Sequence, residues 1–153
     1  MIKGVLYLVP ATLGNHDTRL TIPPGMADLV RDIQGFIVEN VRSARRYLKL
    51  LDRDIDIDRL TFYELNEHTS QEEVPSFLGP AEKGRNTAII SEAGMPGVAD
   101  PGAAVVKLAH EKGIRVIPLT GPSSVLLSLM ASGFNGQQFT FHGYLPIPQN
   151  QRA

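Results

Sequence analysis

Short apolar runs rich in β-branched residues alternate along this chain with segments of helical periodicity, and this alternation restricts the fold more than any other feature. The runs with the character of strands are residues 5–9, 36–39, 60–65, 87–91, 115–119 and, more weakly, 139–143. Strands that return repeatedly through helices form right-handed crossovers and a mostly parallel sheet. The pattern therefore predicts an α/β fold, a doubly wound sheet of about five mostly parallel strands with helices on both faces.

The segments between these runs have the apolar spacing of helices. Met26, Leu29, Val30 and Ile33 lie at i, i+3, i+4 and i+7, which places them on one face of a helix. Further helices are expected over residues 43–51, 103–112 and 123–132, the last two closed by a glycine. Residues 71–82 are expected to be helical only in part, because two prolines interrupt them.

Composition excludes several classes of protein. A formal net charge of -1 argues against a uniformly basic nucleic-acid binder, and the lack of cysteine excludes disulfides and thiolate zinc sites. The four histidines are scattered without the spacing of metal ligands, so no metal site is expected. No apolar run approaches the length of about 18 residues that a membrane span needs. We therefore expect a cytoplasmic protein that does not enter a membrane.

Residues 91–102 contain three glycines and two prolines between an expected strand and an expected helix. Glycines allow positive φ and close backbone approach to a ligand, and helix N-terminal amides can meet its polar groups. A small cofactor held largely by main chain is one interpretation. The other is a rigid connection in which Asp100 only caps the helix. The segment lacks the glycine patterns of dinucleotide-binding and P-loop proteins.

Two further loops leave the same edge of the predicted sheet. Residues 10–15 follow the first strand, and residues 120–124 follow the fifth. Each could be a simple turn or cap. Together with residues 91–102 they place three loops of small residues at the carboxyl ends of parallel strands, where ligands bind in such sheets.

These loops are similar to those of a known family. S-E-A-G-M-P-G-V-A-D-P-G (residues 91–102), T-G-P-S-S (120–124) and G-Y-L-P (143–146) resemble the signatures S-D-A-G-T-P-G-I-S-D-P-G, P-G-P-S and G-F-L-P. Those signatures belong to the small-subunit ribosomal RNA 2′-O-ribose cytidine methyltransferases, a branch of the tetrapyrrole methylase superfamily. V-E-N-V-R (38–42) and L-N-E-H (65–68) also resemble family segments, so the similarity spans nearly the whole chain.

The resemblance implies an S-adenosylmethionine-dependent methyltransferase, whose cofactor lies between two α/β domains. Residues 1–145 would be the first, cofactor-binding domain, and residues 146–153 would begin a linker to a C-terminal domain absent from this chain. The isolated domain would then be inactive, and relatives form homodimers. Carried over by motif, the cofactor-binding residues are Leu13, Gly14, Ser91, Glu92, Ala93, Val98, Ser123 and Ser124.

Four cations, Arg42, Arg45, Arg46 and Lys49, fall at i, i+3, i+4 and i+7 of one expected helix. Such a stripe could bind the phosphates of a ribosomal RNA substrate, or it could be an ordinary solvated helix face. Methyl transfer to a ribose hydroxyl also needs a group that accepts its proton. Glu39 and His68 are the candidates near the expected cleft, although each could instead form an ordinary ion pair or cap.

Two other functions stay open. The cofactor loops are shared across the superfamily, so the acceptor could be a tetrapyrrole or another small molecule. The chain could also be a non-catalytic ligand-binding module that retains the fold.

Overall fold

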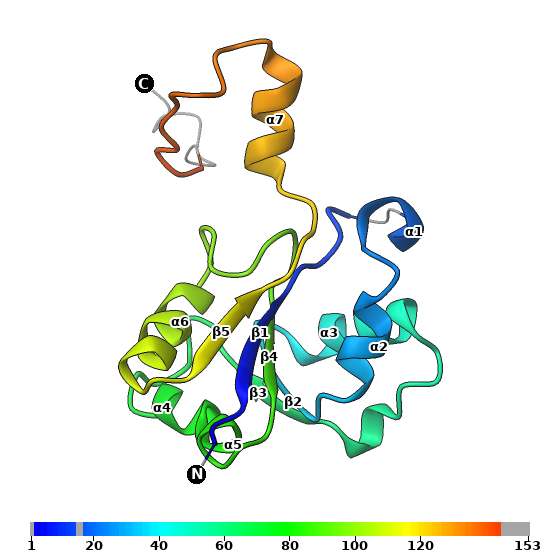
Figure 1. Ribbon diagram of the computed structural model, residues 1–153, viewed down its shortest axis with the longest axis vertical. Helices are drawn as coiled ribbons and strands as arrows, with labels where there is room; N and C mark the ends of the chain where they lie inside the picture. Colours follow the sequence, from blue (N-terminus) through cyan, green and yellow to red (C-terminus); the bar gives the residue numbers. More distant parts are fainter. Residues whose placement is uncertain (1, 15–16, 145–153) are drawn as a thin grey trace. The chain divides into compact units, whose positions relative to one another are not determined.

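A computed structural model describes residues 2–14 and 17–144, and its centre is a parallel sheet (Figure 1). The strands of this sheet lie in the order β3-β2-β4-β1-β5, and every neighbouring pair is parallel. Their bounds are β1 (Val5–Val9), β2 (Gly35–Val38), β3 (Thr61–Glu64), β4 (Thr87–Ile90) and β5 (Arg115–Pro118). The predicted five-stranded α/β fold is confirmed, with strand bounds that differ by at most one residue at each end.

The weak sixth strand was wrong. Residues 139–144 have no strand structure. A strand needs a neighbouring strand for its backbone hydrogen bonds, and this segment pairs with none among the described residues. Within this segment the Phe141 and Tyr144 rings meet edge to face, with centroids 5.5 Å apart.

Helices cover both faces of the sheet, as Figure 1 shows. One face packs against α2 (Met26–Arg31) and α3 (Val41–Leu51), and the other packs against α4 (Val74–Phe77), α5 (Gly79–Glu82) and α6 (Gly102–Glu111). Alternate side chains of each buried strand enter the two cores: Phe36 and Val38 face α2 and α3, whereas Ile37 faces α6. This is the doubly wound arrangement that the sequence predicts.

The helix bounds follow from local chemistry. The Asn40 side chain caps α3 by accepting the Ser43 amide at 3.1 Å, so this helix begins two residues before the predicted start. The predicted partial helix over residues 71–82 divides into α4 and α5, each with a proline in its first turn. The short α1 (Thr18–Thr21) and the 3-10 turn η1 (Ile57–Arg59) were not expected.

The chain divides into two units, residues 1–123 and 124–153. The first holds the sheet and its helices. The second contains α7 (Ser124–Ser132), where the Ser124 and Tyr144 hydroxyl oxygens lie 3.2 Å apart. The predicted linker at residues 146–153 lies outside the described residues. Among the described residues, no helix is long and apolar enough to cross a membrane.

Candidate cofactor and acceptor site

Three loops converge at the carboxyl edge of the sheet: loop 1 (residues 10–14), loop 2 (91–101) and loop 3 (119–123). Gly94 lies at their meeting point with a φ of 71°. A Cβ atom there would lie 3.2 Å from Leu13 Cδ2 of loop 1 and 3.4 Å from the Pro122 carbonyl oxygen of loop 3. Two backbone hydrogen bonds between Ala11 and Gly94, of 2.9 and 3.2 Å, join loops 1 and 2. A glycine is therefore required where the three loops meet.

Loops 1 and 3 also touch directly. A Cβ atom at Gly121 would lie 2.2 Å from the Pro10 Cβ, which is far inside a carbon–carbon contact. The approach follows from the sheet, because β1 and β5 are adjacent and the Leu119 amide continues the pairing by donating to the Leu8 carbonyl at 3.0 Å. The expected clustering of the three loops is thus a consequence of strand order.

Loop 2 is held in shape by one carboxylate. Asp100 Oδ1 accepts the amides of Gly97 and Gly102, each at 2.8 Å, and Gly97 has a φ of 83°. Burial raises the pKa of Asp100, and the two amide hydrogen bonds act in the opposite direction. The N-cap of α6 is Pro101, so Asp100 is not the simple cap that one interpretation expected; its carboxylate instead joins the glycine turn at Gly97 to the first residue of the helix, Gly102.

Ser91 and Glu92 occupy the start of loop 2. The buried Ser91 hydroxyl donates to the Gly94 carbonyl at 3.1 Å, so it shapes the loop. The Glu92 amide donates to Glu39 Oε1 at 3.2 Å, which ties the ends of β2 and β4 together. Burial raises the pKa of Glu39, the hydrogen bond from the Glu92 amide acts in the opposite direction, and the nearby carboxylates of Asp100 and Glu92 raise it further. Glu39 therefore holds the start of loop 2 in place.

The two predicted catalytic residues lie in different settings. His68 is on the loop after β3, with a side chain that is 85% exposed and an Nε2 atom 3.5 Å from Glu67 Oε1. Asn66 Oδ1 accepts the His68 amide at 2.9 Å, which fixes the backbone of this loop. Within the described residues no hydrogen bond or ion pair joins His68 to Glu39.

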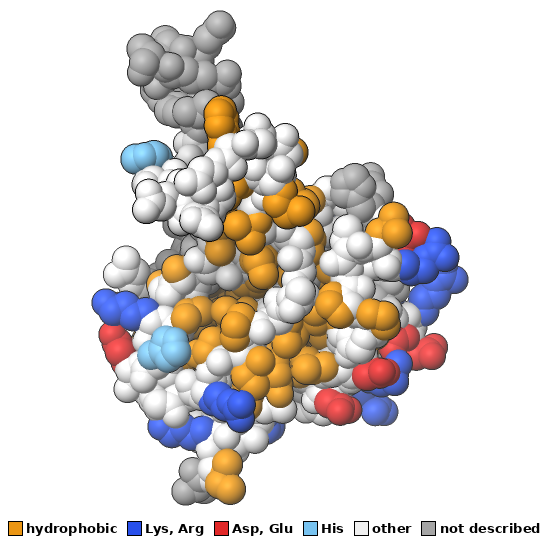
Figure 2. Space-filling view, turned by 45° about the horizontal axis from the view of Figure 1, so that its top comes forward, with side chains coloured by type: hydrophobic (Ala, Val, Ile, Leu, Met, Phe, Trp, Pro, Cys, Tyr) orange, Lys and Arg blue, Asp and Glu red, His pale blue; other side chains and the backbone are white. Residues whose placement is uncertain are grey.

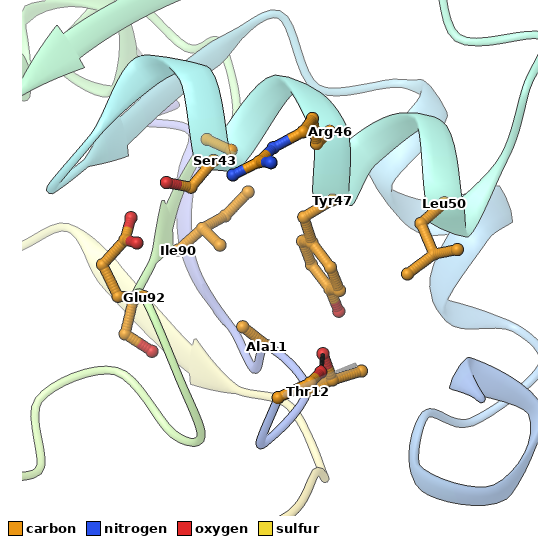
Figure 3. Close-up of a pocket in the computed structure, with 11 residues that line it drawn as sticks. Ala11, Thr12, Ser43, Arg46, Tyr47, Leu50, Ile90 and Glu92 are labelled. Atoms are coloured by element: carbon orange, nitrogen blue, oxygen red, sulfur yellow. Dashed lines mark hydrogen bonds between the residues drawn. The ribbon is translucent and has the colours of Figure 1, made fainter. Parts of the chain in front are cut away.

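A cavity of about 510 Å³ opens between α3 and the ends of β1 and β4 (Figure 3). Helix α3 faces it with residues one helical turn apart, and the sheet edge completes the wall. The lining residues are Ala11, Thr12, Gly14, Ser43, Ala44, Arg46, Tyr47, Leu50, Ile90, Ser91 and Glu92. Of the predicted cofactor-binding residues, Gly14, Ser91 and Glu92 border this cavity, whereas Leu13, Ala93, Val98 and Ser123 do not. Ser124 belongs to the second unit.

Tyr47 forms part of the wall of this cavity. Its buried hydroxyl donates to the Pro10 carbonyl, so α3 is attached to loop 1, and burial raises the pKa of the phenol. Sequence reasoning missed Ser43, Tyr47 and Leu50 as site residues. The available signal was their spacing with Arg46, since residues at i, i+3, i+4 and i+7 share one face of a helix.

The basic stripe of α3 divides into two pairs. Arg45 lies 4.0 Å from the Asp58 carboxylate and over the Phe62 ring at 5.6 Å, and Lys49 donates to the Arg53 carbonyl at 2.8 Å. Arg42 and Arg46 have no carboxylate partner among the described residues. Arg42 and Arg46 are thus the members of the stripe whose side chains have no ion-pair or hydrogen-bond partner in the described part of the chain.

Elsewhere the charges of opposite sign are mixed. On the face shown in Figure 2, Lys and Arg side chains at one edge lie beside Asp and Glu side chains. Arg31, for example, contacts both Asp28 and Asp52. No group of acidic and histidine side chains within the described residues is arranged to hold a metal ion.

Comparison with known proteins identifies relatives over nearly the whole chain. The chain is 37% identical over 154 residues to ribosomal RNA small subunit methyltransferase I of Mesorhizobium japonicum, covering 99% of this chain and 49% of that protein. It is 31% identical over 150 residues to the protein of that name from Escherichia coli O157:H7, covering 98% of this chain and 50% of the relative. The Bacillus subtilis protein is 32% identical over 142 residues, which are 93% of this chain and 46% of the relative. No protein-family model matches. The chain spans about half the length of these relatives.

Proposed function

Because the chain belongs to the family of ribosomal RNA small subunit methyltransferases, we propose that it forms the cofactor-binding half of an S-adenosylmethionine-dependent enzyme that methylates a ribose hydroxyl of ribosomal RNA. The observation that carries the proposal is the meeting of loops 1, 2 and 3 at Gly94. Three loops of small residues at the carboxyl ends of parallel strands form the usual ligand site of a doubly wound sheet.

The residues at this meeting point fit the cofactor. S-adenosylmethionine, when bound, supplies a methyl group on a positively charged sulfur. Leu13 and the 46% exposed Val98 offer apolar contact for its adenosyl group, and the small exposed Gly14 and Ala93 allow main chain to approach it. Ser91 contributes by shaping loop 2, because its hydroxyl is used within the loop. Ser123 of loop 3 completes the proposed set in the first unit, and Ser124 in the second unit is assigned to the cofactor by its motif alone.

The other predicted residues receive different roles in this proposal. We assign RNA phosphate first to Arg42 and Arg46, and in second place to Arg45 and Lys49, which also contact Asp58 and the Arg53 carbonyl. Glu39 borders a space of only about 10 Å³, which is too small for a ligand. Its carboxylate accepts the Glu92 amide, so we assign it the role of positioning loop 2. His68 is then the candidate that accepts the ribose proton, a role worth about 10²–10⁴-fold in rate. The resemblance also predicts a homodimer, which light scattering of the protein would detect.

Transfer of a labelled methyl group tests the proposal. An enzyme that contains this chain as its cofactor-binding half, joined to the second half that the relatives have, is incubated with methyl-labelled S-adenosylmethionine and small-subunit ribosomal RNA, with a tetrapyrrole as a second acceptor. A DNA strand of the same sequence is the matched control, because it lacks the 2′-hydroxyl. We expect label in the RNA alone. Label in the tetrapyrrole would refute the RNA assignment, and S-adenosylmethionine binding without transfer to any acceptor would support a non-catalytic module.

A further inference from the structure

The cavity beside α3 adjoins the meeting point of the three loops, because loops 1 and 2 border both, but Leu13, Gly94 and Pro122 of the meeting point do not line it. The cavity lies over β1 and β4 on the side of α3, and its wall is made by Tyr47 and Leu50. The meeting point at Gly94 includes Pro122 of loop 3, which follows β5 on the opposite side of β1 from β4. Most of the proposed cofactor-binding residues lie outside the cavity, so a second ligand has room beside the cofactor.

The cavity is lined on one part by apolar side chains and on another part by a basic one. Ala11, Ala44, Leu50 and Ile90 provide an apolar wall, and the 57% exposed Leu50 leaves part of it open. In Figure 3, Tyr47 and Leu50 project from α3 into this space, and the Arg46 side chain extends toward Ser43, about one turn earlier in the helix. A volume of about 510 Å³ is within the usual range for a small-molecule ligand, about 300–1,000 Å³.

Arg46 is the charged group that selects the ligand. Its guanidinium has no carboxylate partner among the described residues, although Arg45 beside it on the helix has one. A guanidinium presents a planar set of donors that matches phosphate oxygens. Glu92, on the opposite side of the cavity, offers a carboxylate that can accept hydrogen bonds from sugar hydroxyls. An apolar wall, a carboxylate and a free arginine together suit a base, a ribose and a phosphate.

We infer that this cavity binds one nucleotide of the acceptor RNA, with its phosphate on Arg46, its sugar near Glu92 and its base against the Tyr47–Leu50 wall. The inference rests on the proposed function for the identity of the second ligand. It assigns the cavity to the acceptor, and it makes Arg46, rather than the whole basic stripe, the residue that distinguishes a nucleotide from a nucleoside.

Calorimetric titration with cytidine 5′-monophosphate and with cytidine tests the inference. Arg46→Gln should weaken binding of the monophosphate by about tenfold or more, as expected for loss of a charge-assisted contact, and leave binding of cytidine unchanged. Arg45→Gln is the matched control, because it removes a neighbouring exposed cation that already has a partner. We expect this control to change affinity for the monophosphate less than about twofold.

A parallel titration with S-adenosylmethionine separates this inference from the proposed function. Unchanged S-adenosylmethionine affinity in Arg46→Gln supports a separate acceptor pocket. An equal loss for both ligands would show that the cavity belongs to the cofactor and would overturn the inference. So would failure of the wild-type protein to bind the monophosphate, or equal effects of the two substitutions. Monophosphate binding without any S-adenosylmethionine binding would refute the proposed function and keep the nucleotide pocket.

Discussion

Gly121→Ala should loosen the contact between loops 1 and 3. The new methyl carbon would lie 2.2 Å from Pro10 Cβ and 2.3 Å from Pro10 Cγ. Carbon atoms in favourable contact are about 3.5–4.0 Å apart, so one of the loops must move by more than about 1 Å. Gly121 does not have a positive φ, so the expected effect is steric and does not come from backbone strain.

The cost of this movement should resemble that of other overpacked sites, about 1–3 kcal/mol. With a urea m-value of about 2 kcal/mol/M, the midpoint of unfolding should fall by about 0.5–1.5 M at unchanged m. Because Pro122 also borders Gly94, the shifted loop should weaken S-adenosylmethionine binding as well. A substitution in a turn would thus affect both stability and cofactor affinity.

Urea unfolding and calorimetry of the Gly121→Ala protein provide the measurement. Gly25→Ala is the control, because a Cβ there meets no atom within 4 Å and Gly25 has an ordinary φ of -72°. The control should change unfolding free energy by no more than about 0.5 kcal/mol. If both variants unfold at the same urea concentration, the close approach of loops 1 and 3 is incorrect.

Three further predictions concern the support of the loops. Asp100→Ala removes the acceptor of the Gly97 and Gly102 amides and should lower the unfolding free energy, measured in urea, by about 2–4 kcal/mol. Asp100→Asn retains an acceptor oxygen and should lower it less. Equal losses in the two variants would contradict the role of these hydrogen bonds. Glu39 has a raised pKa in the folded protein, so its contribution to stability is full below its ordinary pKa and is lost as pH rises through the raised value. The unfolding free energy of wild type minus that of Glu39→Gln should therefore fall as pH rises above 4.5, the ordinary pKa of the group. A constant or rising difference would be inconsistent with a raised pKa. Tyr47→Phe leaves the Pro10 carbonyl without its donor and should cost about 1–3 kcal/mol in the same assay, with no loss meaning that the hydrogen bond contributes nothing.

The sequence predicts the sheet well because its strands are covered on both faces. Residues such as Phe36, Ile37 and Val38 form a continuous apolar run, which is typical of a buried parallel strand. The false strand at residues 139–143 alternates aromatic with polar residues, as a half-buried strand does, but this period does not reveal whether a partner strand exists. The helix α1 has four residues, too few to show a period, and depends on the cap that Asp17 provides.

The position of the site is predictable in part, because it follows from the order of the strands. Strand order brings loops 1, 2 and 3 together, so knowing the fold class is enough to expect their clustering. The partner of each side chain, in contrast, depends on contacts between segments that are distant in the sequence. Arg45 meets Asp58 of η1, and the Ser91 hydroxyl turns into its own loop, neither of which follows from helix spacing or motif. The cavity likewise depends on how Tyr47 attaches α3 to loop 1.

Titration of S-adenosylmethionine into the protein tests the central claim most directly, with Gly94→Ala as the diagnostic variant. The claim predicts saturable binding at one site. It also predicts a marked loss in Gly94→Ala, because an L-residue with positive φ costs about 1–2 kcal/mol and the new Cβ would lie 3.2 Å from Leu13. Gly25→Ala should bind as wild type does. Absence of binding at millimolar ligand, or equal affinity in all three proteins, would contradict the assignment of the loops to the cofactor.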